Sequence, residues 1–144
     1  MTLLTGLVVF LRYTLGEGSV AMQESITYLH ACIFMFGASY ALQQGEHVRV
    51  DVFYRRFSPT GQAWVNALGT LVFLIPLCIF IFFSSLTYVD NAWAIKETSS
   101  NAGGLRYVYL LKSVIPLMAV CLLLQAIGEF LTAAKTLVIT EAKA

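Results

Sequence analysis

The sequence predicts an all-α membrane protein with four transmembrane helices in a single domain, residues 1–144. Of the 144 residues, 58% are hydrophobic and only 12% are charged, whereas soluble domains carry about 25% charged residues. The chain has no charged residue between Glu24 and Glu46, between Arg56 and Asp90, or from Ser113 to Gly128. About 20 apolar residues cross the ~30 Å hydrocarbon core as a helix. A water-soluble fold of this size could not bury so many such runs.

The expected helices cover approximately residues 1–15, 24–44, 59–89 and 105–134. The first would span only ~22 Å, so either this crossing is shortened or the natural chain begins upstream of Met1. Ser58 and Pro59 are typical of a helix N-cap followed by the first helical position. Pro76 and Pro116 lie inside apolar runs, where we expect each to kink its helix.

The segment between the second and third helices is polar. Its charged and titratable residues are Glu46, His47, Arg49, Asp51, Arg55 and Arg56. Val50, Phe53, Tyr54 and Phe57 follow the spacing of one helical face, which predicts a short amphipathic helix in the membrane interface. The alternative is a plain connecting loop whose arginines set the topology. The six polar residues are candidates for interfacial or partner contacts.

Lysine and arginine counts predict the orientation. With four crossings, one side holds Arg49, Arg55, Arg56, Lys135 and Lys143, and the other holds fewer basic residues. The bias places the 45–62 loop and both termini in the cytoplasm. Aromatic residues near the helix ends, where rings favour the interface, are Trp64, Tyr88, Trp93, Tyr107 and Tyr109.

No residue pattern indicates catalysis or a resident cofactor. His30 and His47 would be ~25 Å apart on a continuous helix, which disfavours haem, so we expect His30 to make an interhelical hydrogen bond. The three cysteines are isolated in different apolar runs and are interpreted as packing residues, without disulfide or metal spacing. The net charge of +1 gives no sign of nucleic-acid binding. We therefore predict that the chain is not an enzyme.

A hairpin of the first two helices would bring Arg12 and Glu24 to one membrane surface. A transported-ion site needs charge near the bilayer centre, so we interpret the two as a structural ion pair. Gly37 and Ala41 form a small-xxx-small pair that permits close helix contact.

The stretch from Gly37 to Asp51, with its core His47-Val-Arg-Val-Asp51, resembles the signature of the small permease subunit of tripartite ATP-independent periplasmic (TRAP) transporters. The resemblance continues through further segments and covers nearly the whole chain. These segments are Arg12-Tyr13, Gln23-Glu24, Ser99–Leu105 with its paired glycines, and Leu111–Pro116 followed by Leu124-Gln125.

The resemblance implies a multi-pass protein of the bacterial inner membrane that works beside two partners. A periplasmic solute-binding receptor would capture an organic acid or related solute. A large permease subunit would hold the substrate and sodium sites and move as an elevator. The small subunit would support the large one in the lipid bilayer, with no substrate site, cofactor or metal of its own.

Three other functions fit a chain of four helices, and one of them is a structural membrane protein with no transport partner. A small four-helix exporter would need a carboxylate inside the first helix, whereas Glu17 and Glu24 fall at or beyond the turn. The membrane anchor of a respiratory enzyme would need well-placed haem histidines.

Overall fold

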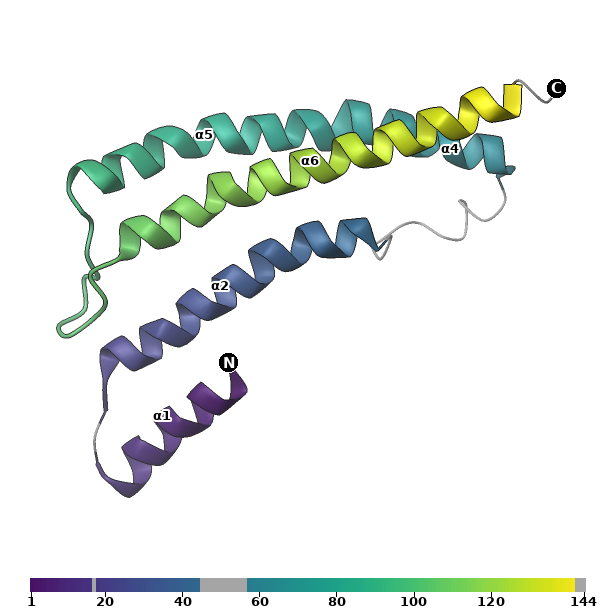
Figure 1. The fold of residues 1–144 in the computed structure, drawn as a ribbon. Coiled ribbons are helices and arrows are strands. Elements are labelled where there is room, and N and C mark those ends of the chain that lie inside the picture. Colours follow the sequence, from purple (N-terminus) through teal and green to yellow (C-terminus); the bar gives the residue numbers. More distant parts are fainter. Residues whose placement is uncertain (17, 45–56, 142–144) are drawn as a thin grey trace.

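The computed structural model describes residues 1–16, 18–44 and 57–141, all helices and turns (Figure 1). The elements are α1 (Thr2–Thr14), α2 (Val20–Gln43), α4 (Pro59–Gly69), the π-helical turn η1 (Thr70–Leu74), α5 (Ile75–Ala94) and α6 (Val108–Glu141). α4, η1 and α5 follow one another without a break and form a single long rod. α6 runs back along this rod, α2 packs on α6, and α1 packs on α2.

Three helices in the described part are long and apolar enough to cross a membrane: Val20–Gln43, Thr60–Ala94 and Val108–Val138. α1 is also apolar, but its 13 residues span only ~20 Å. The all-helical fold is therefore confirmed, and a crossing by α1 stays a prediction. The expected interfacial helix falls largely on residues 45–56, which lie outside the described residues.

The helix bounds differ from expectation at charged or polar positions. α2 begins at Val20 rather than near Glu24, with the Ser19 hydroxyl accepting a hydrogen bond from the Met22 amide. α5 continues past Asp90 to Ala94, and α6 begins at Val108 and ends at Glu141. Charge marks where a helix leaves the hydrocarbon, but backbone hydrogen bonding continues beyond that level. The predicted Ser58 cap is confirmed, since its hydroxyl accepts from the Gly61 amide at 3.2 Å.

The contact between α6 and the rod of α4, η1 and α5, called the seam below, is lined by small buried side chains at seven-residue intervals. On α5 the buried residues are Cys78, Ser85 and Ala92, and on α6 they include Ala119, Ala126 and Ala133. A seven-residue repeat keeps one face of each helix turned toward its neighbour in a left-handed pair. Lipid chains are as apolar as the helices, so the pair gains stability from close backbone approach, which small residues allow.

The π-helical turn keeps this small-residue stripe continuous through Pro76. Ala63 and Thr70 are buried seven residues apart, but the next buried residue, Cys78, comes eight residues later. Pro76 has no amide hydrogen and its ring disturbs the preceding turn. The chain closes that turn with an i+5 hydrogen bond from the Ile75 amide to the Thr70 carbonyl. A π turn absorbs one extra residue, so Cys78 returns to the face that Thr70 occupies.

Candidate functional site: the polar loop between α5 and α6

The polar loop comprises residues 95–107, between the end of α5 and the start of α6. It begins with two backbone hydrogen bonds that end α5. The Glu97 amide donates to the Ala92 carbonyl at 2.9 Å, and the Lys96 amide donates to the Trp93 carbonyl at 3.1 Å. This pair of bonds is a Schellman motif. Its left-handed position is usually glycine, but here Lys96 occupies it with φ of 45°. The motif turns the chain sharply away from the helix axis toward α2.

The carboxylate of Glu24 ties the first turns of α2 to this loop. Its Oε1 accepts from the Ser99 hydroxyl at 2.5 Å and from the Asn101 side-chain amide at 3.0 Å. Its Oε2 accepts from the Leu105 backbone amide at 2.6 Å. Hydrogen bonds to an ionised acceptor are stronger than neutral ones. One side chain of α2 therefore orders a loop that lies more than 70 residues away in sequence.

Gly104 is the residue that lets the loop close around Glu24. A Cβ atom at this position would lie 2.8 Å from Glu24 Oε1 and closer still to the Ser99 side chain. Such contacts cannot be accommodated without moving the loop backbone or the carboxylate. The neighbouring Gly103 has φ of 78°, which most other residues avoid. The paired glycines are thus required by the turn and by the close approach of the carboxylate.

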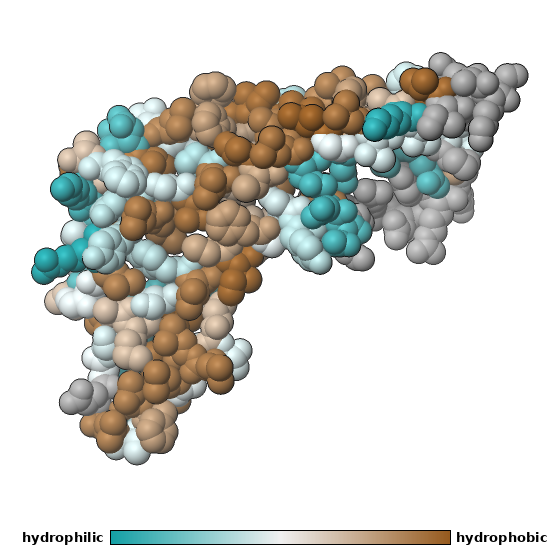
Figure 2. Space-filling model, in the orientation of Figure 1, coloured by the Kyte–Doolittle hydropathy of each residue, from teal (hydrophilic) through white to brown (hydrophobic). Residues whose placement is uncertain are grey.

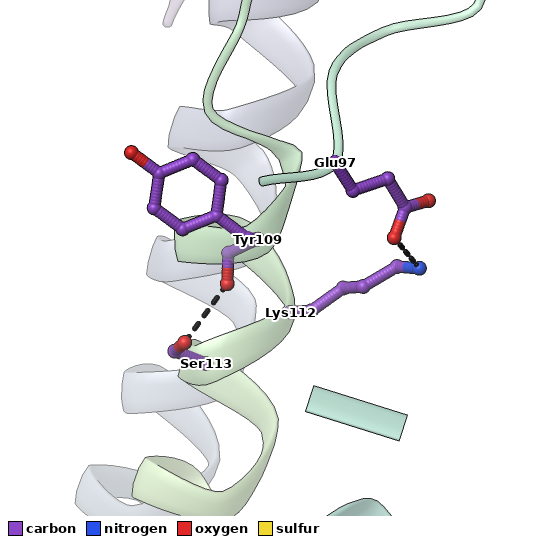
Figure 3. Close-up of polar contacts among 4 residues, drawn as sticks. All are labelled: Glu97, Tyr109, Lys112 and Ser113. Carbon is purple, nitrogen blue, oxygen red and sulfur yellow. Dashed lines mark hydrogen bonds and ion pairs between the residues drawn. The ribbon is translucent and has the colours of Figure 1, made fainter. Parts of the chain in front are cut away.

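A second set of contacts joins the loop to the first turns of α6. Glu97 reaches from the loop to form an ion pair with Lys112, whose Nζ also lies 4.0 Å from the centre of the Tyr88 ring. Figure 3 shows this pair on one side of α6 and, on the other side, the Ser113 hydroxyl, which donates to the Tyr109 carbonyl at 2.8 Å. The Trp93 indole N–H donates to the same Ser113 hydroxyl at 2.8 Å. These contacts join the adjacent ends of α5 and α6.

Charged and aromatic side chains thus gather at one end of the helices. Figure 2 shows hydrophilic residues at that end and hydrophobic residues along the rods. The Trp93 and Tyr109 rings meet edge to face, with centroids 4.8 Å apart. Aromatic rings of this kind favour the membrane interface. The end that carries the polar loop therefore has the composition of a membrane surface.

The polar contacts at this end hold α2, the polar loop and the adjacent ends of α5 and α6 together. Within the described ranges, no group of three or more metal-ligating side chains comes together. A pocket of about 320 Å³ lies between α2, α5 and α6, lined by Ala31, Met35, Tyr88, Val108, Leu111, Lys112 and Ile115. Its one charged residue is paired with Glu97. A small-molecule site usually needs several convergent polar groups, whereas this lining is mostly apolar.

The sequence-predicted site residues lie in three places. Arg12 is in the last turn of α1, and its ion pair with Glu24 stays a prediction, because the carboxylate bonds described above go to the α5–α6 loop. The residues Glu46, His47, Arg49, Asp51, Arg55 and Arg56 lie outside the described residues. Pro76 follows the π turn, and α6 continues unbroken through Pro116, where the kink stays a prediction.

Two predictions concern His30 and the cysteines. His30 is exposed on α2 and contacts Phe34 of its own helix, with ring centroids 6.5 Å apart. The expected interhelical hydrogen bond is not made to any residue that the structure describes. All three cysteines, Cys32, Cys78 and Cys121, are free, as expected.

Sequence reasoning missed the partners of Glu24. The Ser99–Leu105 segment and the Gln23-Glu24 pair each carry part of the family resemblance, but no spacing rule connects them. The paired glycines were the available signal, because a glycine that is not needed for a turn often marks a close approach.

Comparison with known protein families identifies the family of this chain. The family described as tripartite ATP-independent periplasmic transporters, DctQ component, matches residues 1–136. No curated protein and no solved structure matches the chain. The match includes both segments that meet at Glu24, as well as the seam between α5 and α6. The chain therefore belongs to the DctQ family, the small permease component of TRAP transporters.

Proposed function

We propose that this chain braces the large permease subunit of a sodium-coupled transporter that takes up an organic acid or related solute from a periplasmic receptor. The proposal rests on the family match and on one structural observation. The α5–α6 pair has a close-packed small-residue seam, and Glu24 and Lys112 lock it to the loop and α2. A locked bundle with an apolar exterior suits a stationary support better than a moving carrier.

In this proposal, substrate and sodium bind to the large subunit. The spans described here show charge mainly at their ends, and moving a polar solute alone would call for buried charge or broken helices near the bilayer centre. The chain sits in the bacterial inner membrane with the α4 end and both termini in the cytoplasm. The polar α5–α6 loop then faces the periplasm, on the side where the receptor works.

The decisive test is reconstitution of the transporter in proteoliposomes. The large permease and the receptor, with an imposed sodium gradient, are assayed for solute uptake with and without this chain. We expect uptake to fall strongly without it. Full uptake by the permease and receptor alone would refute the bracing role.

Two matched variants test whether stiffness of the α5–α6 pair matters. Ala92 is 1% exposed in the seam, whereas Ala94, two residues further on, is exposed. Ala92→Leu overpacks the seam, at a cost of about 1–3 kcal/mol, and should reduce uptake by the reconstituted complex. Ala94→Leu adds the same side chain in open space and should leave uptake unchanged. Equal uptake by both variants would argue against a need for a stiff seam.

A further inference from the structure

α2 carries two stripes of residues on opposite sides of the helix. Within each stripe, successive members are alternately four and three residues apart in the sequence. The inner stripe is half-buried or buried and consists of Ala21, Ser25, Tyr28, Cys32, Met35, Ser39 and Leu42. The outer stripe consists of Gln23, Thr27, His30, Phe34, Gly37 and Ala41, all exposed except the half-buried Ala41. Alternating four–three spacing is the pattern of a helix that packs along a neighbour at about +20°. The inner stripe is buried by the rest of this chain, and α1 meets α2 near Met22. The outer stripe has the same spacing, and apart from Ala41 it stays exposed within the part of the chain that the structure describes.

His30 shows that the outer stripe does not simply face lipid. It lies six residues beyond Glu24, and thus ~9 Å further along the helix from the level of the polar loop. Its side chain is exposed and has no hydrogen-bond partner among the described residues. Lipid chains cannot hydrogen-bond an imidazole, and polar side chains inside membrane spans usually face protein. An adjacent protein surface would supply the missing partner.

The outer face of the long rod provides the contrast. From Leu71 to Phe83 every exposed side chain of this rod is apolar. Phe73, Phe80 and Phe83 are 75%, 68% and 65% exposed. Large apolar side chains need nothing beyond acyl chains around them. The rod face therefore has the composition of a lipid-facing surface, and the outer stripe of α2 does not.

Gly37 gives the outer stripe the shape of a helix-packing site. A Cβ atom built at Gly37 would meet no atom within 4 Å, so the space beside it is open. Ala41 lies one turn further along the same face, and small residues so placed let a second helix approach closely. Phe34, 69% exposed, stands between His30 and Gly37 as a projecting side chain.

We propose that the outer stripe of α2 is the surface on which a transmembrane helix of the large permease packs. This inference rests on the proposed function and adds the contact face to it. The partner helix crosses α2 at a shallow angle, lies close to it at Gly37 and Ala41, and offers His30 a hydrogen-bonding side chain or a free backbone carbonyl. The phenylalanine-rich face of the rod stays in contact with lipid.

Photocrosslinking tests the contact directly in membranes that contain this chain, the large permease and the receptor. The photoreactive amino acid p-benzoylphenylalanine replaces Phe34 or, as a matched control, Phe80, which is equally exposed at 68%. We expect the Phe34 variant to form an adduct with the large permease and the Phe80 variant to form none. An adduct from Phe80 alone would overturn the inference. So would a Phe34 adduct with the mass of two copies of this chain.

Substitution of two glycines supplies a second measurement. Gly37 and Gly128 both have open space around a built Cβ, so leucine at either leaves the packing within this chain intact. Gly37→Leu should reduce the amount of large permease that copurifies by about tenfold, and Gly128→Leu should not. Copurification that is unaffected by Gly37→Leu refutes this contact face and leaves the bracing role standing. Failure of the unaltered chain to copurify at all refutes the bracing role instead.

Discussion

The α5–α6 pair and α2 show two different ways in which a helix finds its neighbours in a membrane. α5 and α6 bury small residues against each other, and their outer faces are large and apolar. α2 packs one stripe on α6 but keeps most of a second stripe exposed, with polar and small residues on either side of Phe34. Lipid supplies no hydrophobic drive for association, so side-chain size and polarity decide which faces meet protein. The comparison indicates a self-contained pair beside a helix that packs on α6 and α1 but leaves one face uncovered by the described residues.

Removing one residue from the rod should affect the α5–α6 pair most. Deletion of Phe83 from regular α5 rotates Ser85 and Ala92 by about 100° relative to Cys78 and turns them away from α6. We expect the free energy of unfolding to fall by more than it does for a single overpacked position, which costs about 1–3 kcal/mol. The measurement is thermal unfolding of the purified protein in detergent.

The matched control removes a residue from the π turn. Deletion of Phe73 together with Pro76→Ala converts the turn into α-helix and gives Thr70 and Cys78 the seven-residue spacing of the rest of the stripe. This variant should stay close to the parent in melting temperature. If it is destabilised as much as the Phe83 deletion, the π turn does not serve to keep the stripe in register.

The next largest effect is expected at the link between α2 and the pair. Glu24→Ala leaves the Leu105 amide and the Ser99 hydroxyl without their acceptor, and Glu24→Gln keeps one carbonyl oxygen. The melting temperature should fall most for Glu24→Ala, less for Glu24→Gln, and little for the exposed neighbour Gln23→Ala. Distances between spin labels on α2 and the loop should broaden in the same order. Equal melting temperatures for all three would show that α2 does not depend on this carboxylate.

The smallest change in the free energy of unfolding should come from replacing Lys96, the residue with positive φ just after α5. Lys96 holds a left-handed conformation that costs an L-residue roughly 1–2 kcal/mol. Glycine removes that cost but loses about 0.5–1 kcal/mol of chain entropy, so Lys96→Gly should stabilise by about 1 kcal/mol or less. Lys96→Ala keeps the Cβ atom and should give no gain. A gain from alanine equal to that from glycine would place the effect in the lysine side chain rather than in the backbone.

The sequence predicted the helices because long apolar runs leave the backbone no other way to satisfy its hydrogen bonds in lipid. Their ends were placed less well, at Glu24 and Asp90, because charge reports the membrane surface rather than the end of the helix. The cap at Ser58 was predicted correctly from local chemistry alone.

The polar loop and the seam were harder to predict for two physical reasons. The Glu24 contacts join residues far apart in sequence, so no local pattern encodes them. The small-residue stripe is present in the sequence, but its eight-residue step from Thr70 to Cys78 breaks the repeat unless the π turn is known. His30 was expected to bond within the bundle, and its outward position became clear only once the helix faces were defined.

The length of the rod has a consequence for the surrounding bilayer. Trp64 and Trp93, both about half exposed, lie ~44 Å apart along the rod, close to the ~40–45 Å of a bilayer with its headgroup layers. In such a bilayer the rod can stand nearly upright with an indole in each headgroup layer. In a thinner bilayer both rings can stay at the surface only if the rod leans, which displaces the α4 end sideways. The length of the lipid chains thereby sets the tilt of the rod in the bilayer.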